Sequence, residues 1–275
     1  MNKPATTYME FIAHRSISER CRTIIRDHTV SLLSVGRKIS SSSRWVRFPY
    51  YHHVFDDEKK GFTQQLGYLK NFGEFISLSD AVILLGSGTP IDGQYFCITF
   101  DDGFKNNFLN ALPILVENKV PATFFVVTDF IGRSLTNDYT YLRHFFDHGQ
   151  VLMEFMSWED CKNMIDSGME IGSHTVSHAR LANLDADQVK QELSVSKALI
   201  EERLSIKCQH FCVPFGQPDR DFDTNRDPNL VKNAGYVSML TTERGVMEEG
   251  GDPYKIRRDH ILANWSLSQI RYFFS

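Results

Sequence analysis

The sequence has few cysteines, no long apolar run and no excess of basic residues. Five cysteines in 275 residues, none in a Cys-x-x-Cys pair, exclude a disulfide-dense secreted scaffold and favour reduced thiols. No segment approaches the roughly 20 apolar residues that span a bilayer, and the first residues lack the apolar core of a secretory signal peptide. The formal net charge of −4 argues against general nucleic-acid binding. We therefore expect a cytoplasmic globular protein that binds no nucleic acid.

The charge is unevenly distributed. Residues 1–47 carry nine basic and three acidic side chains, whereas residues 48–275 carry a net charge of −10. Ser16 and Glu19 fit a capping box, and apolar or small residues then recur at helical spacing on one face: Ile17, Cys21, Ile24, His28, Leu32, Val35 and Ile39. This pattern favours a helix packed on the outside of the following domain over a helix on an anionic membrane surface. We expect residues 1–45 to form a basic helical extension with a serine-rich linker at 40–43, and peripheral membrane contact remains the alternative.

From residue 46 onward, strand-like and helix-like segments alternate. Strands are predicted at 46–52, 75–78, 95–100, 122–128, 170–173, 210–213 and 236–240. Helices are predicted at 61–71, 105–118, 157–167, 185–204 and 228–233. Such alternation indicates parallel strands joined by helical crossovers, and about seven units without a domain break indicate a closed or nearly closed α/β barrel.

Polar residues follow several of these strands, where barrel enzymes hold their active sites. Asp101 and Asp102 come directly after a buried strand. Neighbouring carboxylates repel each other, so this pair needs a bound cation or a nearby base. A helix N-cap is the alternative, because aspartate also favours that position.

Two histidines follow a later strand. His174 and His178 are four residues apart, which places both imidazoles on one side of a helix or helical turn. Together with one carboxylate they form a three-ligand set with positions left for water and substrate, as in catalytic metal sites.

Two further strand ends carry candidate residues. Pro214 and Gly216 break a strand in a turn that could aim a backbone N–H into the site, or simply end the strand. His52 and His53 close the first strand, where one of them could line the same face.

Three motifs, in this order and spacing, resemble the polysaccharide deacetylases of carbohydrate esterase family 4, the NodB-homology domain. They are Thr-Phe-Asp-Asp-Gly at 99–103, Ser-His-Thr-Val-Ser-His at 173–178 and Pro-Phe-Gly at 214–216. The flanking segments at 48–54, 121–125 and 168–172 agree with the family as well. The resemblance covers residues 46–275.

The resemblance implies a distorted (β/α)7 TIM-like barrel that hydrolyses N-acetyl groups of an amino sugar with one divalent metal. Zinc is the usual ion, with cobalt, nickel, manganese or iron as other candidates. By motif, Asp101 is the general base, and the metal ligands are Asp102, His174 and His178. Phe215, after Pro214, would hold the oxyanion through its backbone N–H, and His52 would contact substrate. An amide leaving group also needs a general acid.

The chain departs from the family pattern at two points. Cys212 stands where many members carry an arginine that pairs with the base, and Arg257 or Arg258 could replace that arginine. The usual late motif that supplies the acid is not clear. His260, beside Asp259, is the candidate, and a surface histidine is the alternative.

The substrate class follows from the resemblance. Relatives with a Tyr-His first strand and no motif-three arginine tend to act in envelope and exopolysaccharide biosynthesis, and a cytoplasmic member would act on a lipid-linked or nucleotide-linked precursor. Two alternatives remain. The same metal site could act on O-acetyl, formyl or cyclic-amide substrates, or the chain could be a catalytically weakened carbohydrate-binding barrel. The oligomeric state is not predicted.

Overall fold

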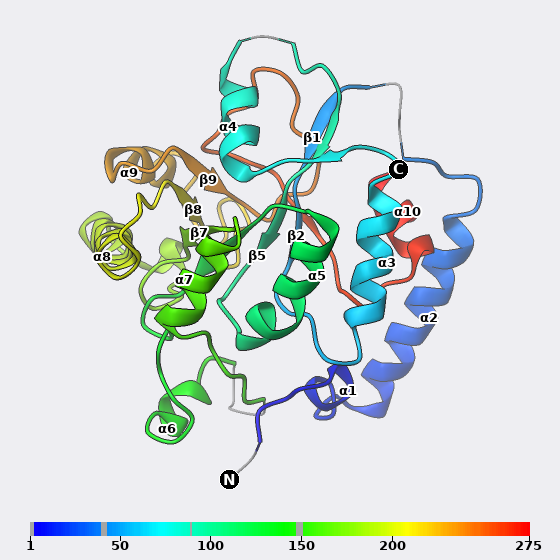
Figure 1. Ribbon diagram of the computed structural model, residues 1–275, viewed down its shortest axis with the longest axis horizontal. Helices are drawn as coiled ribbons and strands as arrows, with labels where there is room; N and C mark the ends of the chain where they lie inside the picture. The colour runs from blue at the N-terminus through cyan, green and yellow to red at the C-terminus, as the bar shows by residue number, and fades with distance from the viewer. Residues whose placement is uncertain (1–2, 40–42, 89, 147–150) are drawn as a thin grey trace.

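A seven-stranded parallel sheet forms the centre of the protein. The computed structural model describes residues 3–39, 43–88, 90–146 and 151–275. In spatial order the strands are β10 (Asp259–His260), β2 (Pro49–Tyr51), β5 (Ile98–Phe100), β6 (Ala122–Val126), β7 (Glu170–Ser173), β8 (His210–Cys212) and β9 (Ser238–Leu240). All neighbouring pairs are parallel, and the sheet curls as in a (β/α)7 barrel (Figure 1). The predicted fold class is confirmed.

The segment 256–261 connects the two edges of this sheet. Ile256 exchanges backbone hydrogen bonds with β9, donating to Met239 at 3.1 Å and accepting from Thr241 at 2.8 Å. Farther along the same segment, Asp259 donates to Phe48 at 2.9 Å on the other edge of the sheet. Residues between these contacts therefore lie where a closing strand would lie in a full barrel.

A second, three-stranded parallel sheet extends two of the barrel strands. Its order is β1 (Trp45–Arg47), β4 (Gln94–Phe96) and β3 (Glu74–Phe75). β1 continues into β2 and β4 into β5, each after a single residue, so the predicted strands at 46–52 and 95–100 are each divided in two. The strand predicted at 75–78 is wrong beyond Phe75, because Leu78 begins α4 (Leu78–Gly86). The Ser77 side chain caps that helix by accepting the N–H of Asp80 at 3.0 Å, a signal that outweighs the short apolar run before it.

Helices surround the sheet where the periodicity predicts them. They are α3 (Lys59–Leu69), the π-helix η1 (Asn107–Ala111), α5 (Leu112–Asn118), α7 (Trp158–Asp166), α8 (Ala186–Leu204) and α9 (Asp227–Asn233). Capping boxes at Ser157 and Asp185 start α7 and α8, as the sequence predicts. The short helices α6 (Tyr139–Leu142) and η3 (Leu181–Asn183), and the last helix α10 (Leu267–Phe274), were not predicted.

Aromatic side chains pack between the sheet and the helix α3 that covers it. Tyr51, Phe100 and Phe124 come from three adjacent strands, and their rings stack at centroid distances of 5.4 and 4.7 Å. All three are fully buried. This packed layer supports the strand ends at which the polar residues lie.

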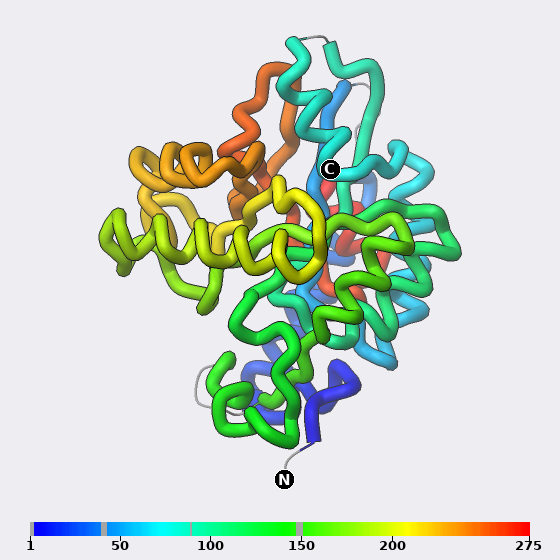
Figure 2. The backbone as a smooth tube through the Cα atoms, turned by 60° about the vertical axis from the view of Figure 1, so that its left-hand side comes forward, coloured from blue at the N-terminus to red at the C-terminus, as the bar shows by residue number. Residues whose placement is uncertain are grey.

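The N-terminal residues pack against the barrel through two helices. α1 (Tyr8–Phe11) lies at the same end of the molecule as the loop that carries α6 (Figures 1 and 2), and Phe11 contacts Phe146 at a ring distance of 5.6 Å. α2 (Ile17–Leu33) begins with the predicted capping box and packs against α10. Of the predicted apolar face, Ile39 is buried beyond the end of the helix, but Ile17, Ile24, Leu32 and Val35 are exposed. The predicted linker lies mainly at 40–42, outside the described residues.

Among the helices of the described ranges, none is long and apolar enough to cross a membrane.

Candidate metal centre and active site

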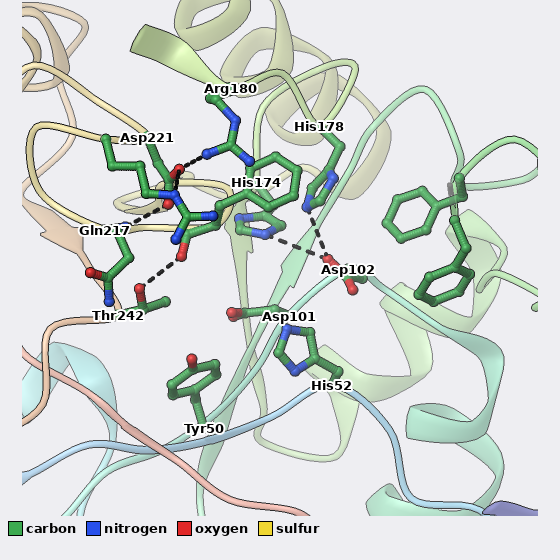
Figure 3. A pocket seen from close by; sticks show the side chains of 14 residues that line it. Tyr50, His52, Asp101, Asp102, His174, His178, Arg180, Gln217, Asp221 and Thr242 are labelled. Atoms are coloured by element: carbon green, nitrogen blue, oxygen red, sulfur yellow. Dashed lines mark hydrogen bonds and ion pairs between the residues drawn. The ribbon is translucent and has the colours of Figure 1, made fainter. Parts of the chain in front are cut away.

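A cavity of about 730 Å³ opens at the carboxyl ends of the barrel strands. Its walls bring together Asp101, Asp102, His174 and His178 from the ends of β5 and β7, with His52 from the end of β2 (Figure 3). Backbone geometry at the strand ends determines how these side chains face the cavity.

A three-residue turn aims Asp102 into the cavity. The N–H of Gly103 donates to the carbonyl of Asp101 at 3.0 Å, and Asp102 between them has a φ of 73°. This is a γ-turn with a left-handed central residue, a rare and strained conformation. Neither aspartate caps a helix, because the next helix begins at Asn107.

A second turn of the same kind exposes the N–H of Phe215. Gly216 donates to the carbonyl of Pro214 at 2.7 Å, and Phe215 has a φ of 62°. Thr242 holds the turn by donating its hydroxyl to the carbonyl of Phe215 at 2.7 Å. Among the described residues, the N–H of Phe215 has no hydrogen-bond acceptor, so it is a free donor beside the cavity, as the motif predicts.

The two motif histidines do not share a helical turn, and that expectation is wrong. Thr175 and His178 have φ values of 69° and 61°, which are incompatible with a right-handed helix. The segment is a loop that α8 holds in place, because Glu192 accepts the N–H groups of Val176 and Ser177 at 2.8 and 3.1 Å. The loop still turns both imidazoles toward one point.

That point is the carboxylate of Asp102. Its Oδ1 lies 3.3 Å from Nε2 of His178 and 3.6 Å from Nε2 of His174. This buried oxygen has no hydrogen-bond partner of good geometry among the described residues. His174 donates Nδ1–H to the carbonyl of Cys212 at 2.7 Å, which leaves its Nε2 as a lone-pair donor toward Asp102. Three donor atoms within 4.8 Å of one another are the set that a divalent cation takes in an open catalytic site.

Burial and charge set the ionisation of this group. Burial lowers the pKa of His174 to about 4, so the ring is neutral at pH 7. Burial alone would raise the pKa of Asp102, but the nearby His178 lowers it overall. Neutral imidazoles and an ionised carboxylate are the forms that bind metal.

Arg258 pairs with Asp101 through both carboxylate oxygens. Its Nη1 and Nη2 lie 2.7 and 2.8 Å from Oδ1 and Oδ2, and both side chains are buried. Burial alone would raise the pKa of Asp101, but the guanidinium outweighs it and holds that pKa well below its usual range. Arg258 lies on the closing segment between β9 and β10. Of the two arginines considered for the place of Cys212, it is the one that reaches Asp101, because Arg257 pairs with Glu243 at the surface.

A second group of donors shares His174 but fits a cation less well. Asp101, His174 and Cys212 also lie close together. Arg258 already occupies both oxygens of Asp101 and would repel a cation there, and burial raises the pKa of the Cys212 thiol far above its usual range. The set around Asp102 therefore suits a metal better.

The two remaining candidate histidines are neighbours. His52 lines the cavity, and its ring centroid lies 5.3 Å from that of His260. His260 is partly buried behind it and is not among the cavity-lining residues. Burial lowers the pKa of both rings, that of His260 to about 3. The side chain of Asp259 faces away and pairs with Arg47 at 3.0 Å.

Several wall residues carry no sequence signal. Arg180 forms an ion pair with the buried Asp221 (Figure 3) and stacks over the ring of Phe215 at 4.3 Å. Tyr50 lies under the guanidinium of Arg258 at 4.1 Å. Arg180 and Asp221 belong to no motif, and only the fold brings them to the cavity, whereas Tyr50 lies in the flanking segment 48–54.

Comparisons with known proteins agree with the geometry. The family model "Polysaccharide deacetylase" matches residues 89–238. YxkH of Bacillus subtilis is 24% identical over 248 residues, which are 85% of this chain and 80% of YxkH. The poly-beta-1,6-N-acetyl-D-glucosamine N-deacetylase of Staphylococcus aureus is 22% identical over 220 residues, covering 74% of this chain and 70% of that protein.

Solved structures show the same fold. IcaB from Ammonifex degensii superposes with a TM-score of 0.70 at 23% identity, covering 84% of this chain and 97% of that one. The deacetylase PplD of Streptococcus pyogenes, solved in complex with acetate, gives 0.66 at 21% identity, covering 86% and 100%. Because the family match includes more than half of the residues, the chain belongs to the polysaccharide deacetylase family.

Proposed function

We propose that this protein is a metal-dependent hydrolase that removes N-acetyl groups from an amino sugar in a polysaccharide, an oligosaccharide or a precursor of one. The observation that carries the proposal is the buried Asp102 oxygen that both His174 and His178 face without a hydrogen bond of good geometry. This arrangement lies in the same cavity as an ionised carboxylate, Asp101, and a free N–H donor, Phe215.

The residues present fit one divalent ion. Asp102, His174 and His178 would hold it, and two imidazoles with one carboxylate suit zinc best, with cobalt, nickel, manganese and iron as alternatives. When bound, such an ion supplies Lewis acidity toward water and an acyl oxygen.

Asp101 and the N–H of Phe215 then have separate roles in the reaction. Asp101, ionised and oriented by Arg258, accepts the proton of the attacking water. The N–H of Phe215 stabilises the oxygen on which negative charge develops, an interaction for which the γ-turn prepares it before substrate binds.

The leaving amine needs a proton. His52 lines the cavity without contacting Asp102, and His260 lies against it. We assign proton donation to this pair, with His260 as the predicted acid and His52 as the ring that meets the substrate. Burial lowers the pKa of both rings, and the charge of Asp101 acts against that shift.

The relatives guide the choice of substrate. An N-acetylglucosamine polymer or oligomer is the first candidate, since a matching relative acts on poly-β-1,6-N-acetyl-D-glucosamine. Lipid-linked and nucleotide-linked N-acetylated sugars are the precursor forms to compare.

The test measures acetate released from N-acetylglucosamine oligomers, with acetylated xylan and a cyclic ureide as comparison substrates. Asp101→Asn should lower kcat by about 10²–10⁴, the contribution of a general base, with metal content unchanged. It should also lower the stability, because the buried Arg258 loses its anionic partner. A matched control is Asp219→Asn, an aspartate in a left-handed turn outside the metal cluster. Equal turnover by Asp101→Asn and the unmodified protein would refute the mechanism. If acid is released from acetylated xylan or from the cyclic ureide but not from the N-acetylglucosamine oligomers, the substrate is a different acyl compound.

A further inference from the structure

Helix α2 presents its apolar residues to solvent and its polar residues to the protein. Against α10, Asp27 accepts from Gln269 at 3.0 Å, and the Ser34 hydroxyl accepts from Arg271 at 3.0 Å. Val30 is the one buried apolar residue of the helix. The packing of α2 therefore rests mainly on hydrogen bonds, which is the reverse of an ordinary surface helix.

The outward face carries a continuous apolar stripe. Its side chains are largely exposed: Ile17 81%, Ile24 57%, Ile25 65%, Leu32 76% and Val35 75%. At 3.6 residues per turn Ile17, Ile24, Ile25 and Leu32 share an arc of about 100° along the helix, together with the exposed Cys21 and His28, and Val35 follows the end of the helix. Apolar residues scattered singly over a surface need no explanation, but a helix-long row of them indicates a binding surface.

Basic residues lie beside this stripe. Arg22 is exposed on its flank, Arg26 is exposed farther round the helix, and Arg37 and Lys38 are exposed just beyond the end of the helix. Of the acidic residues of α2, Glu19 serves the helix cap, and Asp27, which accepts from Gln269 of α10, also forms an ion pair with Arg26 at 2.9 Å. Arg22 has no acidic partner within the described part of the chain. The exposed face of α2 is thus apolar along its middle and positive along its side.

We propose that α2 binds the surface of an anionic lipid bilayer, lying in the membrane plane with its apolar stripe among the acyl chains. An apolar row with arginines on its border is the pattern by which interfacial helices bind such surfaces. A second copy of this chain fits less well, because pairing two stripes would bring arginines of both copies together.

The position of α2 ties this surface to the cavity. α2 follows α1 after a short connection, and Phe11 of α1 packs on Phe146, which lines the cavity. Membrane binding through α2 would hold the active site close to the lipid surface. The binding itself does not depend on the proposed reaction.

The test uses the full chain and sedimentation with vesicles of phosphatidylcholine, with or without phosphatidylglycerol. The unmodified protein should bind the phosphatidylglycerol vesicles about tenfold or more tightly than those of phosphatidylcholine alone. The triple variant Ile17→Ser, Ile24→Ser, Leu32→Ser should lose about tenfold or more of that binding. Because these side chains are exposed, its thermal unfolding and its activity on a soluble substrate should stay unchanged.

A matched triple variant controls for general hydrophobicity. Ile83, Leu109 and Val116 are exposed apolar residues on other helices, and their replacement by serine should leave vesicle binding intact. The charge variant Arg22→Glu, Arg26→Glu should remove the preference for phosphatidylglycerol. No binding by the unmodified protein, or equal binding by the stripe variant, would overturn the proposal. A dimer in solution that the stripe variant dissociates would assign this face to a second copy instead.

Discussion

A buried polar cluster that contains histidine lies at each end of the barrel, and the two clusters differ in how their polar atoms are satisfied. At the amino end of the strands, both ring nitrogens of His210 form hydrogen bonds, one with the Ser79 hydroxyl at 3.0 Å and one with the Ser238 hydroxyl at 2.8 Å. At the carboxyl end, His174 and His178 converge on an oxygen of Asp102 that has no hydrogen-bond partner of good geometry among the described residues. Similar residue types thus have different roles in the two clusters. One cluster is a closed network, and in the other three potential metal-ligand atoms lie within 4.8 Å of one another.

The backbone shows the same contrast. Asp102, His178 and Phe215 at the carboxyl end all have positive φ, whereas His210 and Ser238 lie in regular strands. Left-handed non-glycine residues cost about 1–3 kcal/mol each unless surrounding structure holds them. Strain combined with unsatisfied donors marks the functional end of the barrel, and histidine content alone does not.

The largest expected effect comes from removing the shared oxygen. Asp102→Asn keeps the shape of the side chain but replaces an anionic ligand by a neutral amide. Metal affinity should fall by about a hundredfold or more, with activity falling at least as far, since even residues behind the ligands contribute about 10–100-fold. Metal titration followed by isothermal calorimetry measures this. Zinc affinity equal to that of the unmodified protein would contradict the assigned ligand set.

A smaller effect is expected at the guanidinium that pairs with the base. Arg258→Lys keeps the charge but not the two parallel hydrogen bonds, so kcat should drop by about tenfold. The acid limb of the pH–rate profile should move to higher pH, because a weaker partner lets the pKa of Asp101 rise. Arg257→Lys is the matched control, since that neighbouring side chain lies at the surface with Glu243. An unchanged acid limb in Arg258→Lys would show that Arg258 does not tune the base.

The smallest effect on activity, but a clear effect on stability, is expected at the closed cluster. Burial lowers the pKa of His210 to about 4, while the charge of Glu170 opposes this and Lys197 reinforces it. Between pH 6.5 and 4 the unfolded chain therefore binds a proton that the folded protein does not. The free energy of unfolding is therefore highest above about pH 6.5. It falls by about 2–3 kcal/mol as the pH falls toward 4.

His210→Gln should remove that part of the pH dependence and leave metal binding and kcat within about twofold. Urea unfolding at pH 7 and pH 4.5 measures the difference. The exposed His28→Gln should keep the slope of the unmodified protein. If His210→Gln weakens metal binding, the two clusters are coupled and the contrast between them fails.

Most of the barrel and half of the site follow from the sequence, for local reasons. Strand and helix periodicity predicted the parallel barrel, and three short motifs predicted that Asp101, Asp102, His174 and His178 would meet. The helical turn between the histidines was wrong, because nothing in a His-x-x-x-His spacing reveals left-handed backbone. Arg258 could be suspected but not chosen over Arg257, since only barrel closure decides which side chain points inward. The apolar face of α2 was visible as a pattern, yet its exposure depends on polar contacts with α10, more than 230 residues away.

The pairing of Asp101 with Arg258 also has a consequence for the order in which this enzyme matures. The two residues are 157 positions apart, so during synthesis the aspartate pair at 101 and 102 emerges long before the guanidinium does. Until then, two neighbouring carboxylates repel each other inside an open sheet. Addition of the segment 256–261 supplies both the missing edge contacts and the missing positive charge. The base would therefore reach its working charge state in the same late step in which the nascent barrel closes, and a ribosome-bound chain without that segment would carry the motifs but not the catalyst.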